Sequence, residues 1–208
     1  MVLTPPPVAP DPGPAVTPRP ASLAPLRRVL VVGVTGAGKT SGARRVADLI
    51  GAPFHELDVL AIGPQWSTRP SFAAEVDRLL AEPAWVFDSY GYPEVRDALW
   101  AAADTILWLD YPLRVVLPRV LRRSLARSAS GDQIFGGNRE SWSDWLSRDH
   151  PVWWSLATFR TRRDDLFHRS LAPLAQHLRT VRLISPREFE RWLADRQELA
   201  VLTAPRRD

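Results

Sequence analysis

The sequence predicts an α/β fold in which a five-stranded parallel sheet is flanked by helices. Short runs of branched and aromatic apolar residues alternate along the chain with segments whose apolar residues recur at helical spacing. The links between them are short, and the run at residues 29–32 is continuously apolar, as is typical of a parallel strand buried on both faces. This alternation is the pattern of a doubly wound sheet.

Five strands are predicted from such runs, at residues 29–32, 54–57, 85–87, 105–109 and 181–184. Helices are predicted at residues 41–50, 71–80, 94–102, 113 to about 127 and 186 onwards, with tryptophan-rich helical segments between 141 and about 178. Gly51 ends the first helix, Ser71 caps the second, and Pro118 interrupts the fourth. A mobile loop rich in serine and glycine is expected at residues 128–138.

Composition and length limit the class of protein. The 208 residues suffice for one domain with a sizeable core, and the absence of cysteine excludes disulfides and thiolate metal sites. No run approaches the roughly 20 apolar residues of a membrane-spanning helix. Nine of the 20 prolines lie in residues 1–25, which we expect to form a disordered arm. We therefore expect a soluble, cytoplasmic domain at residues 26–200, followed by a flexible tail at residues 201–208.

The motif that carries the most chemistry follows the first predicted strand. Residues 33–40 fit the phosphate-binding pattern G-x-x-x-x-G-K-[ST], with a strand before it and a helix after it, so a P-loop NTPase fold is predicted. Backbone N–H groups of such a loop cradle phosphate oxygens, and the Thr40 hydroxyl is offered to Mg²⁺. The residues expected to hold the nucleotide are Gly33, Thr35, Gly36, Ala37, Gly38, Lys39, Thr40 and Ser41.

Lysine usage indicates which nucleotide binds. Of 27 basic residues only Lys39 is a lysine, and it stands inside the loop, where a compact ammonium fits between β- and γ-phosphate oxygens. The guanine-reading motif Asn-Lys-x-Asp needs a second lysine, which the chain lacks. ATP with Mg²⁺ is therefore the predicted ligand.

Three aspartates follow predicted strands: Asp58, Asp88 and Asp110. Because the carboxyl ends of parallel strands meet at one edge of a sheet, we expect these side chains to converge beside the phosphate loop. Asp88 and Asp110 are predicted to hold Mg²⁺ together with Thr40, and Asp58 to accept the proton of a hydroxyl acceptor or to orient that hydroxyl. For each aspartate, capping of the following helix is the alternative.

Several segments resemble the adenylate kinase-like P-loop kinases. They are Trp-Val-Phe-Asp at residues 85–88, followed by an aromatic and glycine loop and a helix, and Asp-Thr-Ile-Leu-Trp-Leu-Asp-Tyr-Pro at 104–112. Gly-Asn-Arg-Glu-Ser-Trp at 137–142 and Ser-Arg-Asp at 147–149 resemble a subgroup of small bacterial proteins described as adenylate kinase-like or DNA topology modulation proteins. The resemblance covers roughly residues 27–196, and it implies a small helical lid at about residues 128–165.

The resemblance also implies roles for single residues. Asp88 matches the aspartate near magnesium, Arg119 the arginine against adenine, and Arg123 one that contacts phosphate. Lid arginines of this family close over the transferred phosphoryl group, and the candidates here are Arg148, Arg160 and Arg163. Arg160 and Arg163 share a helix face at three-residue spacing, which suits two donors on one anion. A solvated helix face is the alternative for both, and it is favoured for Arg162.

The chain departs from this family after Asp88. Adenylate kinases continue with Gly-Phe-Pro-Arg, whose arginine grips AMP, whereas this chain continues with Ser-Tyr-Gly-Tyr-Pro at residues 89–93. AMP is therefore not the expected acceptor. Tyr90, Tyr92 and Trp66 are candidates for stacking on a flat acceptor or for the core, and the tryptophans at positions 142, 145, 153 and 154 are expected to pack the lid.

These observations favour an ATP-dependent kinase that moves the γ-phosphate of ATP to a small acceptor such as a nucleotide or nucleoside. The alternative is a non-catalytic, regulatory ATP-binding protein that acts on DNA or a protein partner through its arginine-rich surface. A simple ATPase ranks last, because Tyr111 rather than a glutamate follows Asp110. We expect no membrane partner, rank nucleic acid below the small acceptor, and expect a monomer or a weak dimer.

Overall fold

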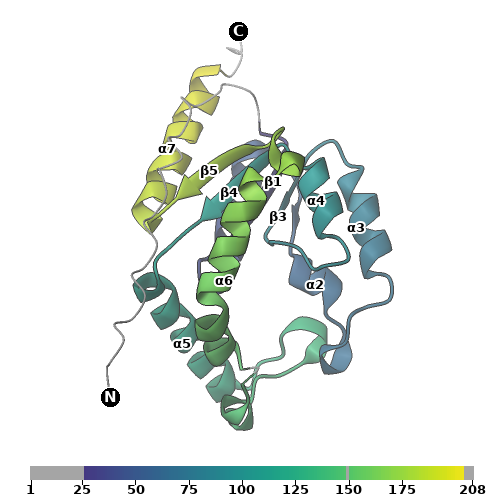
Figure 1. The fold of residues 1–208 in the computed structure, drawn as a ribbon, viewed down its shortest axis with the longest axis vertical. Coiled ribbons are helices and arrows are strands. Elements are labelled where there is room, and N and C mark those ends of the chain that lie inside the picture. Colours follow the sequence, from purple (N-terminus) through teal and green to yellow (C-terminus); the bar gives the residue numbers. More distant parts are fainter. Residues whose placement is uncertain (1–25, 149, 204–208) are drawn as a thin grey trace, which may run out of the picture.

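The computed structural model describes residues 26–148 and 150–203 of the chain (Figure 1). The predicted arm at residues 1–25 lies outside the described residues, as do residues 204–208 of the predicted tail. The first three residues of that tail belong instead to the last helix, α7 (Pro186–Thr203). The tail prediction is therefore wrong at residues 201–203.

The predicted five-stranded parallel sheet is confirmed. Its strands are β1 (Arg28–Gly33), β2 (Phe54–His55), β3 (Trp85–Phe87), β4 (Thr105–Leu109) and β5 (Arg179–Leu183). They lie in the order β2-β3-β1-β4-β5, and every neighbouring pair is parallel. β1 is thus the central strand, and Leu30 pairs with Phe87 on one side and Ile106 on the other. The loop after β1 consequently begins at the middle of the carboxyl edge of the sheet.

Helices cover both faces of the sheet (Figure 1). They are α1 (Lys39–Ile50), α2 (Leu57–Ala61), α3 (Phe72–Leu80), α4 (Arg96–Ala102), α5 (Leu113–Ser130), α6 (Pro151–Leu171) and α7, with short 3₁₀ helices η1 (Pro64–Trp66), η2 (Phe135–Gly137), η3 (Trp142–Leu146) and η4 (Pro173–Ala175). None of these described helices combines the length and apolar character needed to cross a membrane.

Alternate residues of β1 point into two separate apolar cores, as the period of a strand requires. Leu30 and Val32 belong to the core formed with α3, α4 and α6. Val29 and Val31 belong to the core formed with α1 and α7. The sheet is therefore buried on both faces, which explains the continuous apolar run that predicted it.

The second predicted strand is shorter than expected. β2 ends at His55, and Leu57 begins helix α2 because its backbone N–H donates to Asp88 Oδ1 at 3.1 Å. Asp58 therefore lies in the first turn of α2 and not at the end of a strand. An acidic residue is favourable there because the N-terminus of a helix carries partial positive charge.

The prediction that Pro118 interrupts the fourth helix is wrong. α5 continues through Pro118 to Ser130, with Val116 and Val120 buried on its inner face. Packing of that face compensates for the one backbone hydrogen bond that proline removes. Gly131, at φ +63°, ends the helix, so the predicted loop begins there and not at residue 128.

Candidate functional site

The phosphate loop has a conformation that only glycine accommodates at one central position. Gly36 has φ +84°, and a Cβ atom there would lie 2.5 Å from Val120 Cγ2 and 2.7 Å from the backbone oxygen of Val116. A residue with a side chain would therefore be both strained and crowded against α5. The close approach between the loop and α5 thus explains why glycine stands at position 36.

Helix α1 directs its N-terminus into the loop. Its N-cap is Gly38, which has no side chain to satisfy the free N–H groups, and its first turn contains no acidic residue. Free N–H groups and the helix dipole make such an end a binding site for phosphate. The residues predicted to cradle the nucleotide accordingly surround an anion-binding helix end.

Lys39 lies where positive and negative side chains meet. Burial, the largest effect, lowers the pKa of its ammonium below the ordinary value. The charges of Asp58 and Asp88 raise this pKa, and those of Arg123 and Arg162 lower it. Lys39 Nζ donates to a carbonyl of the loop itself at 3.3 Å. Of these two arginines, Arg123 lines the large cavity, where its positive charge suits a bound polyphosphate.

Thr40 and Asp88 form a direct pair. Thr40 Oγ1 donates to Asp88 Oδ2 at 2.5 Å. Burial raises the pKa of Asp88 to about 6, although the hydrogen bonds from Thr40 and from the Leu57 backbone lower it. Hydroxyl and carboxylate oxygens are ligands that suit Mg²⁺, which keeps most of its other ligands as water and phosphate oxygen. The pair therefore fits the ion that the loop predicts.

Asp110 is placed differently from the prediction. Its buried carboxylate accepts hydrogen bonds from Arg163 Nε at 2.5 Å and from Arg182 Nη2 at 2.6 Å. Among the described residues, Asp110 is not part of the cavity walls around the loop, and no three acidic or histidine side chains cluster as a metal site. Two guanidiniums thus bind the carboxylate that was predicted to hold Mg²⁺. Because Arg163 binds Asp110, the prediction that Arg160 and Arg163 share one anion is not met.

A large cavity of about 1520 Å³ extends from the phosphate loop along α5. Arg119 and Arg123 both line it, as does Arg127, which the sequence did not indicate. Arg119 Nη1 donates to the backbone oxygen of Ala37 at 3.3 Å. Arg148 and Arg160 are exposed and are not among the described residues that line it. The cavity therefore brings together the two arginines predicted to contact the nucleotide, and it does not bring in Arg148 or Arg160.

A second cavity of about 400 Å³ meets the first one. The two share part of their lining, namely Thr35, Lys39, Asp58, Asp88 and Trp154. From there the smaller cavity continues between the loop at residues 89–93 and helix α6. Trp154 was expected only to pack the lid, so its place in both walls differs from the prediction. The two cavities therefore adjoin at Lys39.

The aromatic residues near this junction have separate roles. Tyr92 donates its phenolic hydrogen to Asp58 Oδ1 at 2.9 Å, and burial raises the pKa of Tyr92 above its ordinary value. Tyr90 is buried and packs edge-on against Trp100. Trp66 is 54% exposed. Tyr92 therefore orients Asp58, and Tyr90 is anchored in the core while forming part of the cavity wall.

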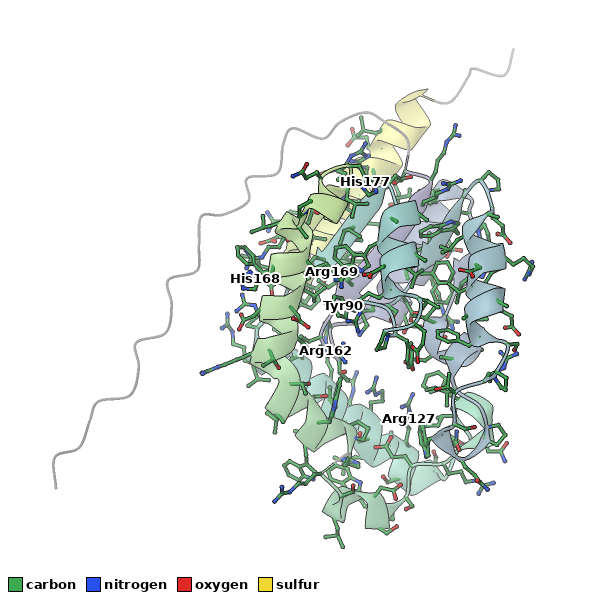
Figure 2. The ribbon with its side chains drawn as sticks, turned by 45° about the vertical axis from the view of Figure 1, so that its right-hand side comes forward. Tyr90, Arg127, Arg162, His168, Arg169 and His177 are labelled. Carbon is green, nitrogen blue, oxygen red and sulfur yellow. The ribbon has the colours of Figure 1, made fainter. Side chains whose placement is uncertain are left out.

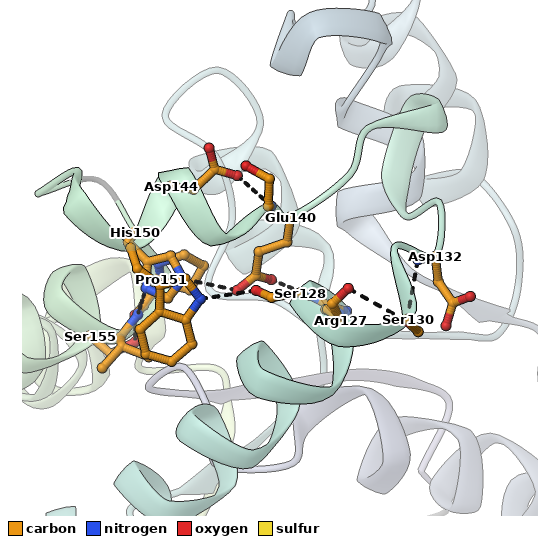
Figure 3. A network of polar contacts seen from close by, with 12 residues as sticks. Arg127, Ser128, Ser130, Asp132, Glu140, Asp144, His150, Pro151 and Ser155 are labelled. Atoms are coloured by element: carbon orange, nitrogen blue, oxygen red, sulfur yellow. Dashed lines mark hydrogen bonds and ion pairs between the residues drawn. The ribbon is translucent and has the colours of Figure 1, made fainter.

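Buried polar contacts join the predicted lid to α5 (Figure 3). Glu140 Oε1 lies 3.1 Å from His150 Nε2, and Glu140 Oε2 lies 3.8 Å from Arg127 Nη1. The Trp145 ring lies 4.3 Å from the His150 ring, and its indole N–H donates to Ser128 Oγ at 2.9 Å. Arg127, Glu140 and His150 line the large cavity, so these contacts stabilise part of its wall. Trp145 packs this region as predicted.

Known proteins share this fold at low sequence identity. No family model matches the sequence, and no curated protein matches it either. A shikimate kinase from Acinetobacter baumannii in complex with shikimate is 17% identical, with a TM-score of 0.52 over 87% of this chain and 96% of that chain. A sugar kinase from Janibacter sp. HTCC2649 is 22% identical, with a TM-score of 0.44 over 88% of this chain and 100% of that chain. A gluconokinase from Sinorhizobium meliloti 1021 is 20% identical, with a TM-score of 0.44 over 86% of this chain and 98% of that chain. The likeness to the shikimate kinase supports the predicted α/β fold with its parallel sheet. The bacterial subgroup that residues 137–142 resemble is not confirmed.

Proposed function

We propose that this protein is an ATP-dependent kinase that transfers the γ-phosphoryl group of ATP to a hydroxyl group of a small acceptor. One observation carries the proposal: the phosphate loop lies at the junction of two cavities, and Lys39, Asp58 and Asp88 line both of them. A protein that only binds ATP needs the larger cavity alone. The second cavity and its carboxylate, Asp58, favour transfer over simple binding.

The donor side is formed by the loop and α5. Loop N–H groups and Lys39 would bind the β- and γ-phosphates, with Arg123 adding charge where negative charge develops. Arg119 would lie beside the adenine ring of ATP. Thr40 and Asp88 would hold Mg²⁺ through their oxygens, and the ion would neutralise charge on the phosphates.

The transfer step uses the junction of the cavities. The acceptor hydroxyl oxygen, held beside Asp58, forms a bond to the γ-phosphorus while the bond from that phosphorus to the bridging oxygen breaks. ADP leaves with the electron pair of that bond, and the hydroxyl proton passes to the Asp58 carboxylate. The hydrogen bond from Tyr92 fixes the orientation of Asp58 for this task.

An acceptor screen tests the proposal. Purified protein with Mg²⁺ and ATP labelled at the γ-phosphate is offered nucleosides, nucleotides, hydroxy acids and polyols. We expect transfer to at least one acceptor well above hydrolysis, and its loss in Lys39→Ala. Arg191→Ala, which removes an exposed cation of α7, should leave transfer unchanged. Hydrolysis without transfer to any acceptor would favour an ATPase or a regulatory ATP-binding protein.

A further inference from the structure

We propose that the acceptor carries an anionic group, a carboxylate or a phosphate, which Arg162 binds in the smaller cavity. This inference rests on the proposed function and specifies its substrate class. It applies to the same site, where Arg162 forms part of the wall of the smaller cavity.

The Arg162 guanidinium contacts two aromatic rings at the cavity wall. Its guanidinium carbon lies 5.0 Å from the centre of the Trp154 ring and 5.6 Å from that of Tyr90. The side chain is half-buried and lines the smaller cavity. Aromatic faces fix the plane of a guanidinium while leaving its N–H groups in that plane free to bind an anion. Arg162 is therefore oriented before any ligand arrives.

The neighbours of Arg162 on α6 have carboxylate partners, and Arg162 has none. Arg163 binds Asp110, and Arg169 binds Asp97 at 2.7 Å. Within residues 26–148 and 150–203, no carboxylate oxygen lies within ion-pair distance of Arg162. A partly buried guanidinium without a counter-ion is costly unless a ligand supplies one.

Positive charge is in excess around Tyr90. Figure 2 shows this residue beside α6, which carries Arg162 and Arg169. The guanidinium carbons of Arg96 and Arg169 lie 4.3 Å and 5.9 Å from the Tyr90 ring centre. Arg96 Nε donates to the backbone oxygen of Gly91 at 3.0 Å, so of these three arginines only Arg169 has a carboxylate partner among the described residues. One anion placed here would balance this charge.

The acids of the cavity already have other partners. Asp58 accepts from Tyr92, and Asp88 accepts from Thr40 and from a backbone N–H. An acceptor in the smaller cavity therefore meets the Asp58 carboxylate and the Arg162 guanidinium in its walls. Its hydroxyl suits the first and an acidic group suits the second. Neutral polyols and nucleosides would leave the N–H groups of Arg162 unpaired, so they should be poor acceptors.

Matched acceptors test this inference. Glycerate is compared with glycerol, and gluconate with glucitol, each with saturating Mg²⁺ and ATP. We expect the acid of the preferred pair to have a kcat/KM about 100-fold above its neutral partner, as is typical for a desolvated charge pair. Arg162→Gln should remove most of this preference, Arg162→Lys should restore part of it, and Arg191→Gln should leave it intact. Equal use of the neutral partner, or a preference unchanged in Arg162→Gln, would overturn the inference.

A binding measurement separates this inference from the kinase proposal. The protein is saturated with Mg²⁺ and a non-hydrolysable ATP analogue, so that the phosphate loop is filled, and inorganic phosphate is titrated by calorimetry. We expect binding that Arg162→Gln weakens at least about 10-fold, while its affinity for the ATP analogue is retained and shows that the variant is folded. No phosphate binding, or binding equal in Arg162→Gln, overturns the anion site whether or not any acceptor is phosphorylated. Phosphate binding without transfer to any acceptor would overturn only the kinase.

Discussion

Thr40 Oγ1 and Asp88 Oδ2 lie 2.5 Å apart and join the first turn of α1 to the end of β3. We expect Asp88→Asn to weaken Mg²⁺-dependent ATP binding by about 10- to 100-fold, because a neutral amide is a poorer partner for the ion. Calorimetry with and without Mg²⁺ measures the effect. The affinity for ATP in the presence of a chelator should not fall, and an equal loss under both conditions would contradict a metal-binding role.

The buried Asp88 also predicts a pH dependence of stability. Its pKa is raised from 3.8 to about 6, so the folded state binds this proton more tightly than the unfolded state does. Stability from this group is present below pH 4 and is lost as the pH rises through about 6, a change of up to about 3 kcal/mol. Urea unfolding from pH 4 to 7 should show the free energy of unfolding of the metal-free wild type falling by this amount relative to Asp88→Asn. A constant difference between the two proteins would show that Asp88 has an ordinary pKa.

Two glycines with positive φ allow the cost of backbone strain to be distinguished from the cost of steric crowding. We expect Gly36→Ala to lower the free energy of unfolding by about 2–4 kcal/mol, because its Cβ would overlap α5 in addition to the strain of φ +84°. Gly51→Ala is the matched control: it has φ +64° with nothing within 4 Å of its Cβ, and it should cost about 1 kcal/mol. Similar losses in both variants would mean that α5 moves aside at no cost.

Tyr92 should act through Asp58. We expect Tyr92→Phe to lower kcat about 10-fold while the affinity for ATP stays the same, because only the orientation of the carboxylate is lost. Asp58→Asn should lower kcat further, and adding Tyr92→Phe to it should have little additional effect. Independent, additive losses would show that Tyr92 does not work through Asp58.

Asp110 is expected to contribute to stability and not to nucleotide binding. Asp110→Asn leaves Arg163 and Arg182 without their shared carboxylate, which should lower the free energy of unfolding by about 3 kcal/mol. The affinity for Mg²⁺ and ATP should stay within about two-fold of the wild type. A loss of metal-dependent binding as large as that of Asp88→Asn would restore Asp110 as a magnesium ligand.

The sheet and the phosphate loop could be predicted because their signals are local. The apolar run before Gly33 and the spacing from Gly33 to Lys39 are readable without knowing any distant contact. The central place of β1 follows from parallel pairing of apolar strands on both sides. These features depend on short segments whose preferences agree with the final fold.

The positions of Asp58, Asp110 and Arg162 depend on distant contacts. Asp58 lies in a helix because the backbone N–H of Leu57, in the same turn, donates to the Asp88 carboxylate, 31 positions further along the chain. Asp110 is oriented by arginines from α6 and β5. The sequence favours a solvated face for Arg162, because three-residue spacing alone does not specify which face of α6 meets the loop at residues 89–93. Its proximity to the rings of Tyr90 and Trp154 becomes visible only once the helix is packed.

Lys39 and Trp154 belong to the walls of both cavities, so neither cavity can be filled without altering the surroundings of the other. Thermodynamic reciprocity then applies to the two ligands. If bound nucleotide changes the dissociation constant of the acceptor by some factor, bound acceptor changes the dissociation constant of the nucleotide by the same factor. The total binding free energy is therefore the same for either order of arrival.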